Sequence, residues 1–156
     1  MRCAFFGRLA VCVALAAVTA APAKDAPAAA KTKDYTGKVV PLAGLLQKFG
    51  ARLDREAAPQ WLALVTNDGD VYPLIRDDAS RMFFKDTRLL NRPMRLTGRL
   101  YKDSHLFQVM AVHSLIKGKL HEVYYWCDIC QIKRFEKKKC DCCGGPMELR
   151  EEPVEK

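Results

Sequence analysis

The 156 residues include 26 lysines and arginines against 18 acidic residues, which gives a formal net charge of +8 at pH 7. A basic chain prefers anionic partners such as nucleic acid, anionic lipid headgroups or acidic polymers. With the N-terminal segments described next set aside, about 120 residues remain, enough for one small domain and a metal-stapled appendage but not for several large domains.

Residues 1–23 have the pattern of a secretory signal peptide. Arg2 and Arg8 give a basic start, an apolar run of thirteen residues follows from Leu9, and Ala21-Pro-Ala23 provides a small-x-small cleavage site. A bilayer span needs about 20 apolar residues, so the run predicts export to the periplasm or the exterior. The alternative is an uncleaved signal that anchors the protein to the membrane. Export disfavours nucleic acid as the usual partner.

Residues 24–34 are rich in Ala, Pro and Lys and predict a flexible linker. Beyond them, alternation and β-branched residues predict a series of strands, and Asn67-Asp68-Gly69 predicts a tight turn between the second and third. These strands are expected at residues 35–40, 61–65, 71–75, 94–101, 106–116 and 121–126.

Two short helices are expected between these strands. Apolar residues recur at helical spacing from Leu42 to Phe49, and Asp77 and Asp78 are placed to cap a second helix that ends at Phe84. About five strands with a helix between the third and fourth are the order of an OB-fold. The expected fold class is therefore mainly β, a small OB-like barrel with one or two short helices.

Three sequence segments in this region show a resemblance to known proteins: Tyr35-Thr-Gly-Lys-Val, Leu64-Val-Thr-Asn-Asp-Gly-Asp-Val-Tyr and Met94-Arg-Leu-Thr-Gly-Arg-Leu. They resemble small exported bacterial OB-fold-like proteins of unknown function. The resemblance covers residues 35 to 116 and implies a barrel over residues 35–120, although the helix after the first strand departs from that order. Turn and strand patterns specify shape rather than chemistry.

The C-terminal part contains two C-x2-C pairs. Cys127 and Cys130 form the first, Cys140 and Cys143 form the second, and nine residues separate them. Four thiolates at about 2.3 Å satisfy a tetrahedral Zn2+ ion, and two short turns supply them from one small unit. Iron fits the same four sulfurs, and zinc is preferred on availability.

Cys140-Asp-Cys-Cys143-Gly144 resembles the C-x-x-C-G knuckle of zinc ribbons and rubredoxin-like modules, and Cys127-Asp-Ile-Cys130 resembles its partner. The resemblance covers about residues 125–148 and implies a structural metal held between short strands. The expected zinc ribbon spans residues 121–150 and is followed by a tail over 151–156. Gln131 departs from the pattern, which has glycine there. The extra Cys142 is a possible substitute for Cys143 as a ligand.

Two other interpretations of the cysteines stay open. Cysteines of exported proteins usually form disulfides, and the five left after signal cleavage would make two bonds and one free thiol. A C-x-x-C pair can also serve thiol redox chemistry, but neither pair opens a helix, which would lower a thiol pKa.

No sequence motif indicates an enzyme: G-x-S-x-G, the P-loop and G-x-G-x-x-G are all missing. His105, His113 and His121 show no metal-site spacing, and His121 is the best substitute ligand. Arg95, Arg99 and Tyr101 could form a binding stripe on one strand. Further basic residues lie nearby, at Arg76, Arg81, Lys85, Arg88, Arg92, Lys133, Arg134 and Lys137 to Lys139.

The expected function is therefore an exported, non-catalytic binding or scaffold protein with a structural four-cysteine zinc site. Its partner would be a protein or an anionic polymer. The alternatives are an extracytoplasmic metal-handling protein and a thiol-redox protein.

Overall fold

The computed structural model describes residues 31–101 and 103–154. The predicted signal peptide and most of the predicted linker lie outside these residues, while Thr32 to Asp34, at the end of that linker, belong to the first strand. The mainly β prediction is confirmed: the described part contains eight strands and two short α-helices. None of its helices is long and apolar enough to cross a membrane.

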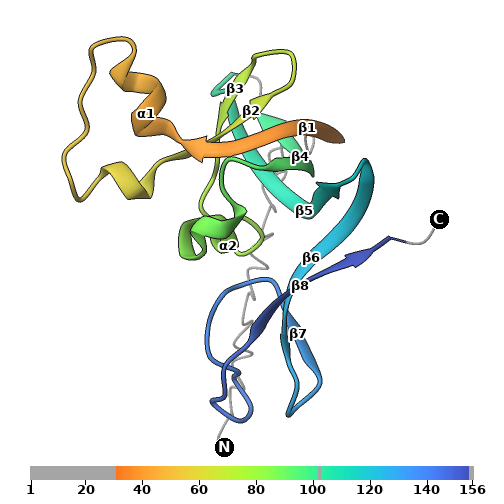
Figure 1. The fold of residues 1–156 in the computed structure, drawn as a ribbon. Helices are drawn as coiled ribbons and strands as arrows, with labels where there is room; N and C mark the ends of the chain where they lie inside the picture. The colour runs from red at the N-terminus through yellow and green to blue at the C-terminus, as the bar shows by residue number, and fades with distance from the viewer. Residues whose placement is uncertain (1–30, 102, 155–156) are drawn as a thin grey trace, which may run out of the picture.

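The elements follow one another in chain order, as the colours of Figure 1 show. The strands are β1 (Thr32–Pro41), β2 (Leu62–Thr66), β3 (Val71–Pro73), β4 (Pro93–Tyr101), β5 (Leu106–Ile116), β6 (Lys119–Cys127), β7 (Ile132–Arg134) and β8 (Glu148–Pro153). The helices are α1 (Leu42–Gln47) and α2 (Arg81–Lys85), with the short 3-10 helices η1 (Ala58–Gln60) and η2 (Thr87–Leu89).

The second helix starts later than the sequence predicts, at Arg81. Asp77 closes the turn before it: the Ser80 N–H donates to Asp77 Oδ1 (3.3 Å), and the Asp77 N–H donates to Ser80 Oγ (3.0 Å). The Asp77 carboxylate therefore caps the turn of residues 77–80 instead of the first turn of α2, because a side chain of this kind can hydrogen-bond nearby backbone N–H groups outside a helix.

The strands pair in the order β3-β2-β1-β4-β5-β6-β7, and β8 pairs with β6. Beyond β3, Leu74 forms a parallel bridge with Phe107 of β5, and the Ile75 N–H donates to the Phe107 carbonyl at 2.9 Å. The end of β3 therefore returns to β5. The ladder itself is open, so the closed OB-like barrel stays a prediction.

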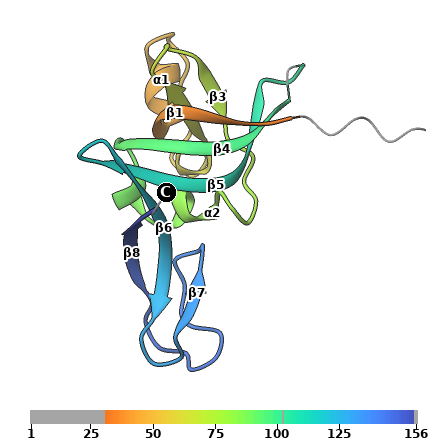
Figure 2. The ribbon, with the colours of Figure 1, turned by 90° about the vertical axis from the view of Figure 1, so that its right-hand side faces the viewer.

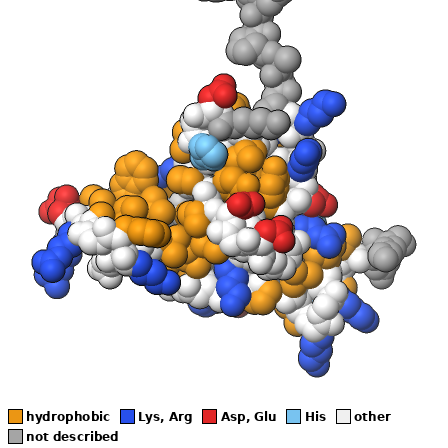
Figure 3. All heavy atoms as spheres, turned by 90° about the horizontal axis from the view of Figure 1, so that it is seen from above, with side chains coloured by type: hydrophobic (Ala, Val, Ile, Leu, Met, Phe, Trp, Pro, Cys, Tyr) orange, Lys and Arg blue, Asp and Glu red, His pale blue; other side chains and the backbone are white. Residues whose placement is uncertain are grey.

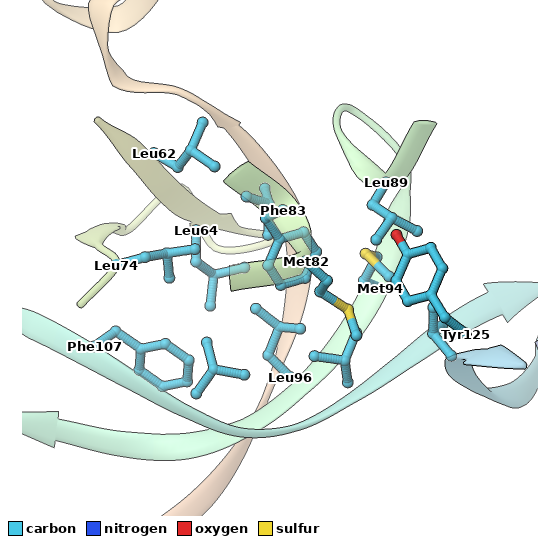
Figure 4. Packing of buried hydrophobic residues seen from close by; sticks show 14 residues of the cluster. Leu62, Leu64, Leu74, Met82, Phe83, Leu89, Met94, Leu96, Phe107 and Tyr125 are labelled. Atoms are coloured by element: carbon cyan, nitrogen blue, oxygen red, sulfur yellow. The ribbon is translucent and has the colours of Figure 1, made fainter. Parts of the chain in front are cut away.

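One core joins the barrel region to the C-terminal part. Val123 and Tyr125 of β6 are fully buried in the same cluster as Leu89, Met94 and Phe107. Figure 4 shows Tyr125 among these packed side chains. The expected boundary at residue 120 falls inside β6, and the expected tail contributes Glu151 to Pro153 to β8. We call residues 119–154 the C-terminal arm.

The C-terminal arm extends away from the stacked strands β1, β4 and β5 (Figure 2). Its first strand, β6, begins beside β5 and ends at Cys127, where β7 and β8 flank it. The strand thus carries the first cysteine outward on an element that is anchored in the core.

Candidate metal centre

The two cysteine pairs occupy the two loops of the C-terminal arm. Cys127 and Cys130 form the turn between β6 and β7, in which Cys127 pairs with Ile132. Cys140 and Cys143 lie in the loop between β7 and β8. Because β7 and β8 both pair with β6, the sheet brings the two loops to the same end.

The structure places all four predicted sulfurs together. The Sγ atoms of Cys127, Cys130, Cys140 and Cys143 lie within 4.8 Å of one another, and those of Cys127 and Cys143 are 3.6 Å apart. Four sulfurs at the corners of a tetrahedron, each about 2.3 Å from a zinc ion, would be about 3.8 Å apart. The donor set therefore fits a tetrahedral ion with little rearrangement.

All five cysteines in the described part are free thiols. Disulfide geometry requires an S–S distance of about 2.05 Å, well below the 3.6 Å between Cys127 and Cys143. Cys142 is exposed and stands outside the group of four. This arrangement corresponds to the metal interpretation rather than to the disulfide interpretation.

The two turns have the same backbone geometry although their sequences differ. The Gln131 N–H donates to the Cys127 carbonyl at 2.8 Å, and the Gly144 N–H donates to the Cys140 carbonyl at 2.9 Å. Both residues adopt the left-handed backbone conformation, with φ of 54° at Gln131 and 69° at Gly144. Gln131 therefore adopts the conformation that the family pattern assigns to glycine, with the strain of a residue that has a Cβ.

We expect Gln131→Gly to stabilise the metal-loaded protein by up to about 1 kcal/mol, because it removes this backbone strain. The measurement is the urea midpoint of unfolding at fixed metal content. Gly144→Ala is the matched control: no atom would crowd the added Cβ, so only the strain changes, and a loss of about 1 kcal/mol is expected. A destabilised Gln131→Gly variant would contradict the equivalence of the two turns.

Backbone N–H groups point at the sulfurs. The Gly145 N–H lies 3.4 Å from Cys143 Sγ. Hydrogen bonds from the backbone N–H groups of Cys143 and Cys142 lower the pKa of Cys140 to about 7. Such donors stabilise thiolate, which is the form that binds a metal.

Crowding of the thiols acts in the opposite direction. Hydrogen bonds with the thiols of Cys142 and Cys143 raise the pKa of Cys130. Four ionised sulfurs at these distances repel one another, and a divalent cation relieves that repulsion. Burial is uneven: Cys127 and Cys140 are buried, while Cys143 is exposed.

Each turn carries an aspartate after its first cysteine, and both are ion-paired. Asp128 pairs with Arg150 of β8. Asp141 pairs with Lys138 at 2.9 Å and with Arg134 at 3.2 Å. The pairs with Arg150 and Arg134 connect the two turns to β8 and β7. They also bring cations close to the four thiolates, which together with one bound Zn2+ would carry a formal charge of about −2.

A buried carboxylate, which the sequence pattern did not indicate, contacts both the core and the loop between the two cysteine pairs. Asp86, between α2 and η2, is 1 % exposed and accepts a hydrogen bond from the Tyr125 hydroxyl at 3.0 Å. Arg88 donates to it from Nε at 2.9 Å, and Lys137 of the loop between the cysteine pairs lies 3.9 Å away. Hydrogen bonds from Arg88 lower the pKa of Asp86 to about 2.

None of the three histidines belongs to the four-sulfur group. His121, the predicted substitute ligand, has its Nδ1 atom 3.1 Å from the Lys119 carbonyl oxygen. His113 is half-buried on β5, and His105 has a positive φ in the turn before β5.

Several of the basic residues noted in the sequence already have acidic partners. Arg81 pairs with Glu136 at 3.2 Å, Arg88 with Asp86 and Arg92 with Glu151. On the face drawn in Figure 3, Lys and Arg side chains are distributed among and around several apolar areas and do not gather into one large patch. The stripe predicted on β4 stays a prediction.

Comparison with protein-family models, curated proteins and solved structures finds no match to this chain.

Proposed function

We propose that this chain is an exported, non-catalytic binding or scaffold protein whose C-terminal arm is held by one structural metal ion, with Zn2+ preferred over iron. The observation that carries the proposal is the placement of the Cys127, Cys130, Cys140 and Cys143 sulfurs within 4.8 Å of one another. Four protein sulfurs complete a tetrahedral shell, which leaves no position for water or substrate. That donor set supports a structural role.

The OB-like barrel is part of the same proposal. The strand order runs from β3 through β2 and β1 to β4 and β5, and the Leu74–Phe107 bridge leads from β5 back to the end of β3. This strand order, together with the single bridge that the described residues form from β5 back to the end of β3, supports an OB-like arrangement. Export rests on the basic and apolar pattern of residues 1–23.

One observation favours metal handling as a second candidate. Cys143 is exposed, and the free thiol of Cys142 is next to it in the chain. An exposed ligand beside a spare thiol gives an incoming chelator or acceptor protein a route for exchange. A structural site and a transfer site then differ in how fast the ion leaves.

Elemental analysis with thiol titration tests the proposal. We expect one zinc ion per chain and four thiols that are protected from modification. The zinc should pass to a chelating dye only over hours or longer. The variant Cys142→Ser serves as the control, because among the described residues it removes the single thiol outside the four-sulfur group. Release within seconds would favour metal handling, whereas a metal-free chain with disulfide-linked C-x2-C pairs would contradict both candidates.

A further inference from the structure

The structure contains a cationic cavity whose lining residues, between Lys38 and Asn91, precede the described cysteines in the sequence. It has a volume of about 450 Å³ and lies between α1 and the ends of β1 and β2. Lys38 and Lys48 line it together with the amides of Asn67 and Asn91, and no carboxylate lines it. Figure 1 shows α1 standing out from the sheet beside these strands.

The lysine and asparagine side chains of this cavity have no partner among the described residues, whereas the Thr66 hydroxyl, which also lines it, accepts a hydrogen bond from the Asp70 N–H at 3.1 Å. Among residues 31–101 and 103–154, the side chains of Lys38, Lys48, Asn67 and Asn91 make no hydrogen bond or ion pair. Two cations and two amides thus face one hollow, so its charge complements an anion that can also accept hydrogen bonds.

The backbone holds the two asparagines in place. The Asn67 N–H donates to the Thr36 carbonyl at 3.0 Å, and the Asn91 N–H donates to the Val39 carbonyl at 2.8 Å. Both anchor points belong to β1, on either side of Lys38 in the chain. The backbone of Asn91 is in the left-handed conformation, with φ of 60°, which asparagine tolerates better than most residues. The backbones of the two asparagines are therefore fixed relative to β1 before any ligand binds, and their exposed amides remain open to a ligand.

Apolar groups lie next to the cationic ones. Val40, Leu45 and Val65 line the cavity. The helix α1 has the predicted amphipathic spacing yet contains no buried residue, and Phe49, which follows Lys48, is 86 % exposed. An apolar helix face that covers no core is available for a ligand.

We infer that this cavity binds the anionic headgroup of a phospholipid, with the apolar side chains of α1 contacting its acyl chain. The lysines compensate the phosphate charge and the amides donate to its oxygens. Leu45 and Phe49 cover part of the chain. The inference gives the proposed binding role a partner, but it does not depend on the metal, so either can fail alone.

The test uses NMR titration of the full chain with three soluble probes: dihexanoyl phosphatidylglycerol below its micelle concentration, dihexanoyl phosphatidylcholine and glycerol 1-phosphate. We expect the backbone amides of Gly44, Asn67 and Asn91 to shift, and the phosphatidylglycerol probe to bind at least tenfold more tightly than either of the others. Metal content is measured on the same samples.

Two variants and a matched control locate the site. The double variant Lys38→Gln, Lys48→Gln is expected to weaken binding of the anionic lipid at least tenfold, and Phe49→Ser at least threefold. The double variant Lys117→Gln, Lys119→Gln removes the same charge from the turn after β5 and the first residue of β6, and it is expected to change the binding of the anionic lipid less than twofold.

Four outcomes would overturn the inference. Equal binding of glycerol 1-phosphate would indicate a site for soluble anions. Equal binding of phosphatidylcholine would indicate apolar contact alone, and equal loss in the control variant would indicate diffuse charge. Shifts confined to other amides would place the ligand elsewhere. Thermal unfolding of each variant verifies that the fold is retained.

Discussion

Replacing Cys140 with serine is expected to remove the metal and to destabilise the core together with the C-terminal arm. Metal binding supplies on the order of 10 kcal/mol of folding free energy in small zinc peptides, so the loss here should reach several kcal/mol. Val123 and Tyr125 belong both to the C-terminal arm and to the common core, and Met147 and Leu149 pack against that core. Unfolding of the arm therefore withdraws side chains from the core.

The two tryptophans make this expectation measurable. Trp61 precedes β2, and Trp126 lies on β6 next to the first cysteine. Urea unfolding of Cys140→Ser, followed in single-tryptophan variants, should show both probes shifted to lower urea. Cys142→Ser is the matched control and should keep its metal and its midpoint, since Cys142 lies outside the four-sulfur group. A normal Trp61 transition beside a lost Trp126 transition would mean that the arm folds independently of the core.

Replacing Asp86 with asparagine is expected to cost about 2 kcal/mol at neutral pH. The folded protein holds the pKa of Asp86 at about 2, mainly through hydrogen bonds from Arg88, whereas the unfolded chain has the ordinary value of about 3.9. Because the folded pKa is the lower one, folding favours the ionised form. The stabilisation is complete above about pH 5 and is lost as the pH falls toward 2.

The difference in unfolding free energy between wild type and Asp86→Asn, measured from pH 7 to pH 2.5, isolates this effect. Metal loss at low pH occurs in both proteins and cancels in the difference. The gap should narrow steadily below pH 5. Tyr125→Phe removes one hydrogen bond to the same carboxylate and should cost about 1 kcal/mol at neutral pH. A gap that stays constant with pH would show that Asp86 acts through packing rather than charge.

Local spacing predicted the parts of the site that local spacing controls. Two residues between cysteines place both sulfurs on one turn, and two such turns on a short hairpin need little else to meet. Strand alternation likewise predicted β4, because Met94 and Leu96 are both buried on one face of that strand. Gln131 looked like a departure in the sequence, yet its backbone has the geometry that glycine has in the other turn.

The remaining features needed the tertiary structure because they join residues that are distant in the chain. Asp86 is unremarkable until Tyr125, 39 residues later, donates to it in a buried site. Strand β8 is polar in sequence and becomes a strand because β6 offers it an edge. The sequence by itself determined that two C-x2-C turns could share an ion, since that depends on local spacing, while the choice of Cys143 over Cys142 came from the structure. Only the tertiary structure decided that their loops share a core with the barrel region, because burial depends on where distant strands meet.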